Sequence, residues 1–202
     1  MSPDIEPQPF RICLDLNIWC AAALSDAAGR TGSATQFLVE QVRRGVTGFG
    51  PTQLVVSWGM LNRLGLVLER VGFSRASADT ILAEIALIAQ VGPAELSPLL
   101  ILGGTGLAPL RDVEDLHVLE VAFTGRAQLL VTANFQDFVS YGTEVLKPGR
   151  VGVQKRLRHE VVIAHPHVAV EWVRSGQIQL GRPAPTGREP ISLSLSLPAS
   201  PP

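Results

Sequence analysis

The sequence predicts an α/β protein whose parallel sheet is covered by helices on both sides. Short apolar segments alternate along the chain with amphipathic segments of helical periodicity. This order is typical of strands joined by crossover helices. One apolar segment, residues 129–131, carries no polar residue at any position, which suits a strand at the centre of a parallel sheet.

The elements follow one another from residue 11 onward. Gly45 and Gly72 are expected to stop two of the helices, because glycine ends helices readily. Residues 145–163 mix β-branched and basic residues and give a weaker signal. The apolar patterns predict strands at residues 11–16, 54–56, 99–102 and 129–131, and helices at residues 18–28, 33–44, 58–71, 74–90, 113–124 and 167–174.

Residues 110–138 contain the clearest helix-to-strand unit. Asp112 is placed as an N-cap and Gly125 as a left-handed helix stop. Three polar residues, Thr132, Asn134 and Asp137, follow the strand at 129–131. Because ligands of open α/β sheets bind at the carboxyl ends of the strands, we expect the chemistry at this edge.

The amino-acid composition excludes several classes of protein for this chain. With 46% hydrophobic and 17% charged residues among 202, the chain can bury a sizeable core, so disorder of the whole chain is excluded. The net charge of −1 gives no overall attraction for nucleic acid, so any such binding must come from a local patch. The first ten residues lack the basic and apolar regions of a secretory signal, and no segment reads as a membrane span. We expect a cytoplasmic protein.

We expect one folded domain at residues 11–180, with a motif core at 11–138 and a C-terminal extension at 139–180. Residues 1–10 and the tail at 181–202 are expected to be disordered, since six prolines and four serines fall within the tail. Within that tail, ISLSLSL alternates serine with leucine or isoleucine. Such a strand could pair with a sheet edge of a partner or of a second copy, which would give a homodimer.

Two acids on separate elements are candidate metal ligands. Asp15 ends the first strand and Asp115 begins a helix, and both positions fall at the same edge of a parallel sheet. Converging carboxylates suit a hard divalent cation such as Mg²⁺ or Mn²⁺. The alternative is that Asp15 forms a turn and Asp115 caps a helix.

Four segments in order, LDLNIW at 14–19, VVSWGMLNRL at 55–64, RDVEDLHVLEVA at 111–122 and VTANFQDF at 131–138, resemble the motif regions of the PIN-domain family. The resemblance implies a three-layer α/β/α sandwich and a metal-dependent ribonuclease centre. It also implies, for bacterial members, frequent service as the VapC-like toxin of a toxin–antitoxin pair.

The resemblance assigns roles to individual positions. Asp15 matches the first acid of the family and Asp115 the third. Asn134 stands where the fourth acid often lies, with Asp137 three residues on. The second acid, usually a glutamate, is replaced by Asn62 or Arg63. The acid tetrad is therefore incomplete.

Two functions follow as hypotheses. The first is an endoribonuclease that uses Mg²⁺ or Mn²⁺, with Asp15 and Asp115 as ligands and Asn134 and Asp137 as support. An antitoxin or another protein would then be a partner besides RNA. The second is a catalytically weakened PIN fold that binds RNA or protein.

Other polar residues carry open interpretations. Five basic residues within 12 positions either track an RNA backbone or form a solvated hairpin face. His117 is interpreted as a helix-surface or packing residue, and His165 and His167 as part of a helix-entry loop. The basic residues are Lys147, Arg150, Lys155, Arg156 and Arg158.

Overall fold

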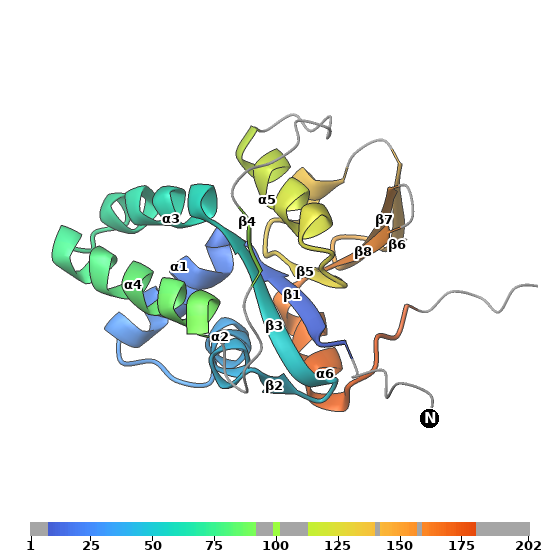
Figure 1. Ribbon diagram of the computed structural model, residues 1–202, viewed down its shortest axis with the longest axis horizontal. Helices are drawn as coiled ribbons and strands as arrows, with labels where there is room; N and C mark the ends of the chain where they lie inside the picture. Colours follow the sequence, from blue (N-terminus) through green and yellow to red (C-terminus); the bar gives the residue numbers. More distant parts are fainter. Residues whose placement is uncertain (1–7, 92–98, 102–112, 140–141, 157–158, 181–202) are drawn as a thin grey trace, which may run out of the picture.

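The structure is a computed structural model that describes residues 8–91, 99–101, 113–139, 142–156 and 159–180 (Figure 1). The strands are Phe10–Leu14 (β1), Val46–Thr47 (β2), Gly50–Ser57 (β3), Leu99–Ile101 (β4), Leu129–Val131 (β5), Thr143–Lys147 (β6), Val151–Arg156 (β7) and His159–Ala164 (β8). The helices are Leu16–Ala27 (α1), Ala34–Arg44 (α2), Trp58–Arg70 (α3), Arg75–Val91 (α4), Val113–Thr124 (α5) and Pro166–Ser175 (α6), with a 3₁₀ helix at Phe135–Phe138 (η2).

The described strands form one mixed sheet in the order β2-β3-β1-β5-β8-β7-β6, and β4 also pairs with β3. Strands β4, β3, β1, β5 and β8 run parallel, whereas β7 and β6 continue the sheet as an antiparallel hairpin. The three residues of β5 are completely buried, as their apolar sequence predicted.

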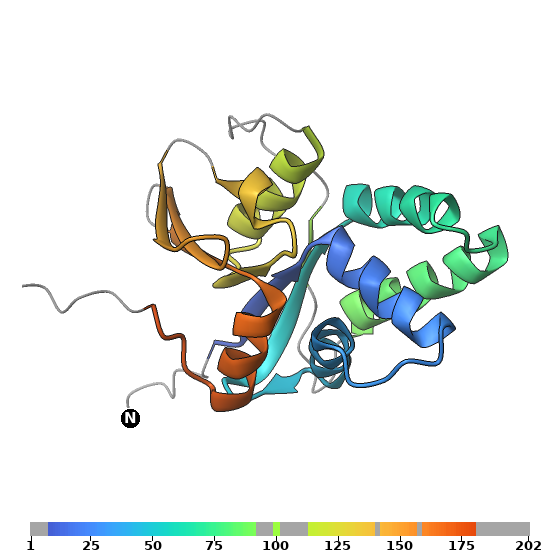
Figure 2. The same ribbon diagram turned by 180° about the vertical axis from the view of Figure 1, so that it is seen from behind.

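Helices cover both faces of the sheet, which confirms the predicted three-layer α/β/α architecture. Helix α5 lies on one face, and α6 lies on the other, packed beside α2 (Figures 1 and 2). The central strands are buried from both sides and form the core, while their carboxyl ends open toward one edge.

The helix starts show why these residues form these elements. Ser33 accepts a hydrogen bond from the backbone N–H of Gln36, whose side chain bonds back to Ser33, so that a capping box starts α2. Gly45 ends α2 with φ 64°, as expected. Ser57 caps α3 by accepting from the N–H of Met60.

The end of α5 corrects one expectation. Arg126, and not Gly125, takes the left-handed conformation, with φ 51°. The N–H of Ala127 bonds to the carbonyl of Ala122, and the N–H of Arg126 bonds to that of Phe123. These two bonds define a Schellman motif one residue later than the glycine indicated.

Several expectations lie outside the described residues. These are the N-cap at Asp112, most of the N-terminal segment, and the tail at 181–202 with its alternating strand. Strand β1 already includes Phe10, one residue before the expected start of the domain. None of the helices in the described ranges is both long and apolar enough to span a bilayer.

Candidate active site at the carboxyl edge of the sheet

The carboxyl ends of β1 and β5 bring two parts of the predicted site together. The N–H of Asp15 bonds to the carbonyl of Val131 at 3.0 Å, immediately before Thr132. Parallel pairing of Leu14 with Val131 therefore places residues 15 and 132, which are 117 positions apart, side by side.

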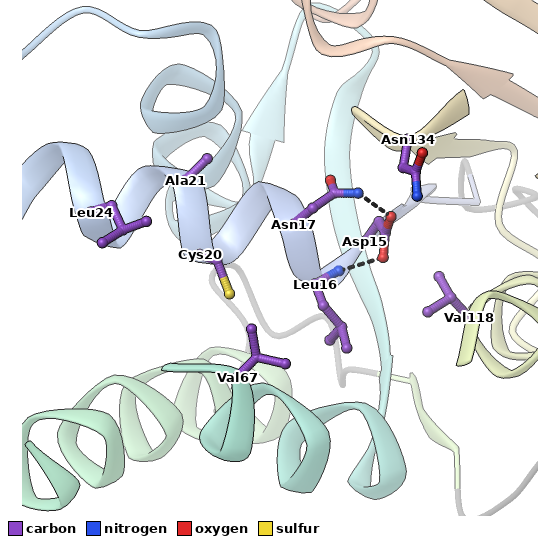
Figure 3. Close-up of a pocket in the computed structure, with 9 residues that line it drawn as sticks. All are labelled: Asp15, Leu16, Asn17, Cys20, Ala21, Leu24, Val67, Val118 and Asn134. Carbon is purple, nitrogen blue, oxygen red and sulfur yellow. Dashed lines mark hydrogen bonds between the residues drawn. The ribbon is translucent and has the colours of Figure 1, made fainter. Parts of the chain in front are cut away.

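The Asp15 carboxylate is buried and held by three donors. Its Oδ1 accepts from the N–H of Leu16 at 2.6 Å, which makes Asp15 the N-cap of α1. Its Oδ2 accepts from Asn17 Nδ2 at 2.5 Å (Figure 3). The same oxygen accepts from the Thr132 hydroxyl at 2.7 Å. These contacts fix the orientation of the carboxylate before any ligand binds.

Burial dominates the electrostatics of Asp15. Loss of solvation raises the pKa of this carboxyl, and the nearby charge of Asp137 raises it further. The hydrogen bonds from Thr132, Leu16 and Asn17 oppose this shift by stabilising the anion, but the net direction of the pKa is upward. A positive charge in the site would remove this penalty.

The segment after β5 folds back over the same network. Asn17 Nδ2 also lies 3.1 Å from the Thr132 hydroxyl, and Asn17 Oδ1 accepts from the N–H of Ala133 at 3.1 Å. The N–H of Asn134 donates to the Thr132 hydroxyl at 3.0 Å. The exposed side chains of Asn134 and Asp137 bond to each other. Thr132, which is completely buried, thus connects the first acid to the predicted support residues.

A cleft of about 380 Å³ opens over this network. Asp15, Asn17 and Asn134 line it, and apolar side chains from α1, α3 and α5 form the rest of its wall (Figure 3). Its lining residues are Asp15, Leu16, Asn17, Cys20, Ala21, Leu24, Val67, Val118 and Asn134. The cleft therefore presents one buried acid and two amides, Asn17 and Asn134, within an otherwise mostly apolar surface.

Helix α5 carries the second predicted ligand. Asp115 lies within α5, and its side chain is not among those that the structure describes. Val118, three positions later, lines the cleft. Positions 115 and 118 are about one helical turn apart, and the role of Asp115 as a ligand stays a prediction.

The region in which the resemblance implies a second acid carries an amide and a cation. On α3, Asn62 is exposed and Arg63 is half-buried. His117, which the sequence indicated only as a surface or packing residue, is half-buried with its Nε2 3.0 Å from the Ser57 hydroxyl. It also packs against Gly59, where a Cβ would lie 2.5 Å from Nε2. No local pattern marks this contact, because its partners are 60 positions apart.

The oxygen donors at this edge suit a hard divalent cation. Asp15 and Asp137 contribute carboxylates, and the side-chain carbonyl of Asn134 can contribute a neutral ligand. Among the residues whose side chains are described, no group of three or more His, Cys, Asp or Glu is arranged to hold a metal ion. The described acids fit a cation by chemistry and charge, and a complete site requires a further ligand.

The structure divides the predicted basic residues between the two ends of β7. Lys147 and Arg150 lie at the turn that precedes β7, beside the carboxyl end of β8. At the other end, Lys155 pairs with Glu160 at 3.2 Å, and the Arg156 guanidinium lies 5.2 Å from the centre of the Phe123 ring. Arg158 lies outside the described residues.

The fold and this edge define an α/β sandwich with an acid-bearing cleft at the ends of its parallel strands. The family model described as "PIN domain" matches residues 11–136, more than half of the chain, so the protein belongs to the PIN-domain family. The PIN domain is a nuclease and RNA-binding fold that generally uses divalent metal ions. Searches of curated proteins and of solved structures found no match.

Proposed function

We propose that this protein is an endoribonuclease that requires Mg²⁺ or Mn²⁺. The observation that carries the proposal is the Asp15 carboxylate, which is 4% exposed, held by three donors and placed at the bottom of a cleft. Burial of this acid beside Asp137 is unfavourable in the absence of a cation, since the loss of solvation and the nearby charge of Asp137 both raise the cost of ionising Asp15. A bound divalent ion offsets this cost.

In this proposal each residue has a definite role. Asp15 and Asp115 are the metal ligands, and Asn134 and Asp137 support them. Thr132, Asn17 and the N–H of Leu16 hold the Asp15 carboxylate in place. When bound, the divalent ion supplies Lewis-acid chemistry, in which a water is activated and charge on the scissile phosphate is stabilised.

Mn²⁺ titration tests the metal site directly. Calorimetry of the wild type should show saturable binding, and Asp15→Asn should abolish it. Asp79→Asn is the matched control, because Asp79 is an exposed acid on α4 and does not line the cleft. Absence of binding at millimolar metal, or equal losses in both variants, would reject the metal-dependent nuclease.

The finer role that we propose is the toxin of a toxin–antitoxin pair, with an antitoxin as protein partner. It is supported by the family alone. Induced expression in a bacterial host should arrest growth, and Asp15→Asn should relieve the arrest at equal protein level. Normal growth of cells that contain the active enzyme would reject the toxin role and would not affect the ribonuclease proposal.

A second candidate function, a catalytically weakened PIN fold that acts as an RNA- or protein-binding module, is favoured by Asn62 and Arg63 in the second motif and by Asn134 in the fourth. An amide or a cation in place of a carboxylate reduces the negative charge that two neighbouring cations require. We expect the site to hold one metal ion and to cleave slowly.

Restoring the acids separates the two candidates. Arg63→Glu, or Asn62→Glu if the register differs by one residue, is combined with Asn134→Asp, and Mn²⁺-dependent cleavage of single-stranded RNA is compared with the wild type. Faster cleavage that Asp15→Asn abolishes supports the nuclease with an incomplete tetrad. If neither the wild type nor the restored variants cleave RNA that they bind, the binding module replaces the nuclease.

A further inference from the structure

A basic cluster lies at the same sheet edge as the cleft. Arg150 is in the turn between β6 and β7, His165 is the N-cap of α6, and His167 lies in the first turn of that helix. Arg150 Nη1 is 3.2 Å from His165 Nδ1, and the two imidazole ring centres are 5.2 Å apart. Three side chains from two segments thus converge on one spot.

The hydrogen bonds define the form of His165. A guanidinium can only donate, so His165 Nδ1 must accept from Arg150, and it also accepts from the N–H of His167 at 3.4 Å. The proton of the neutral imidazole therefore sits on Nε2. Burial, followed by the charges of Arg150 and His167, lowers the pKa of His165, which favours this neutral form. Within the described part of the chain no hydrogen-bond acceptor is found for that Nε2–H.

A series of backbone hydrogen bonds connects this cluster to Asp15. The N–H of Asp15 bonds to Val131, the N–H of Thr132 bonds to Ala164, and the N–H of His165 bonds to Arg150, at 3.0, 3.0 and 2.8 Å. Each step crosses one strand of the sheet, and neighbouring strands lie about 4.8 Å apart. Two steps put His165 roughly 10 Å from Asp15 along the edge. A short piece of extended RNA can span that distance.

We propose that Arg150, His165 and His167 bind a backbone phosphate of single-stranded RNA next to the scissile phosphate. This inference deepens the proposed function and rests on it for the identity of the ligand. Arg150 supplies a permanent cation with a planar fork of donors, which suits phosphate oxygens. His165 supplies a neutral N–H donor, and the exposed His167 adds a third group.

The other end of β7 lacks these properties. Lys155 is paired with Glu160, and Arg156 lies over the Phe123 ring, so that each cation already has a partner. The six residues of β7 separate them from Arg150 by about 17–20 Å. Lys155→Gln therefore removes one positive charge from the same strand without touching the proposed phosphate site.

Fluorescence anisotropy with a labelled single-stranded RNA of mixed sequence, in EDTA to prevent cleavage, tests the proposal over a range of salt. Arg150→Gln should weaken binding and reduce the slope of log K against log salt by about 0.7, the value for one lost phosphate contact on a single strand. His165→Asn keeps an N-cap acceptor but replaces the imidazole Nε2–H by a shorter side chain whose amide N–H groups lie closer to the backbone, so binding should weaken while the slope stays unchanged. Lys155→Gln should leave both unchanged.

The proposal is overturned if Arg150→Gln leaves the slope at the wild-type value, or if Lys155→Gln lowers it equally. Its failure can be distinguished from that of the nuclease. Mn²⁺-dependent cleavage by the wild type together with an unchanged slope in Arg150→Gln rejects the phosphate site alone. The expected slopes without cleavage by any variant support the phosphate site and reject the nuclease.

Discussion

Thr132→Val is the sharpest test of the network that holds Asp15. The substitution preserves the shape of a completely buried side chain and removes only its hydroxyl. That hydroxyl donates to Asp15 Oδ2 at 2.7 Å and accepts from the N–H of Asn134 at 3.0 Å and from Asn17 Nδ2 at 3.1 Å. One atom thus takes part in three hydrogen bonds.

The expected loss follows from these bonds. A hydrogen bond to a charged group contributes about 1.5–3 kcal/mol, and a buried donor without a partner costs about 1–3 kcal/mol. Because Asn17 Nδ2 keeps its bond to Asp15, we expect Thr132→Val to lower the free energy of unfolding by about 3 kcal/mol. Thr132→Ser keeps the hydroxyl and loses one buried methyl group, which costs about 1 kcal/mol.

Urea unfolding of the two variants measures this difference, and the midpoint should move with the slope unchanged. The two variants should also differ in their affinity for Mn²⁺. The bond from Thr132 lowers the pKa of Asp15, so its loss raises that pKa and weakens Mn²⁺ binding at neutral pH. If Thr132→Val is no less stable than Thr132→Ser and binds Mn²⁺ as tightly, the hydroxyl does not hold the carboxylate and the reasoning fails.

Three further predictions rest on other contacts. Burial raises the folded-state pKa of Asp15 above its ordinary value of 3.8. The protonated carboxyl therefore adds to the free energy of unfolding below pH 3.8, and this contribution is lost as the pH rises through the raised pKa. In EDTA the stability of the wild type relative to Asp15→Asn should therefore fall across that window, by at most about 1.4 kcal/mol per pH unit, and a difference independent of pH in urea unfolding would contradict this. Arg126→Gly should stabilise the protein by about 0.5 kcal/mol in thermal unfolding, because glycine relieves the left-handed strain at φ 51°, whereas Arg126→Ala should give no gain. Gly59→Ala should displace His117 from Ser57, so a double-mutant cycle with His117→Ala should give a coupling of about 1 kcal/mol, and additive effects would show that the imidazole moves away freely.

The acid Asp15 and the strand β5, which follows α5, could be predicted because their signals are local. An acid after a short apolar strand, and Thr132 after Leu129–Val131, both mark the carboxyl edge of a parallel sheet. The pairing of β1 with β5, with Leu14 opposite Val131, then brings Asp15 and Thr132 within hydrogen-bond distance. Local composition thus specifies which strand ends meet.

The basic cluster could not be predicted in the same way. Arg150 and His165 are 15 positions apart and meet because β7 and β8 pair in an antiparallel register, with Val151 opposite Ala164. Without that register, the basic residues at 147–158 look like one continuous run. The pairing places Arg150 at the edge of the sheet where the cleft lies and Lys155 at the opposite edge. Likewise, Gly125 indicated the end of α5 correctly but not which residue takes the left-handed turn.

Asp15 caps α1 and, in our proposal, also binds a metal ion, and only the second role requires a charge. As N-cap of α1 it accepts the N–H of Leu16, yet Ser33 and Ser57 cap α2 and α3 with neutral hydroxyls. A serine or asparagine at position 15 could cap the helix equally well and would avoid the unfavourable burial of a carboxylate. The protein instead surrounds this acid with three hydrogen-bond donors and places the charge of Asp137 near it. If Asp15 served only to cap the helix, this arrangement would lower the stability of the protein without a benefit. A cation in the cleft explains it, because the ion offsets the repulsion between Asp15 and Asp137. Capping therefore does not account for the charge at position 15, whereas the proposed metal binding does.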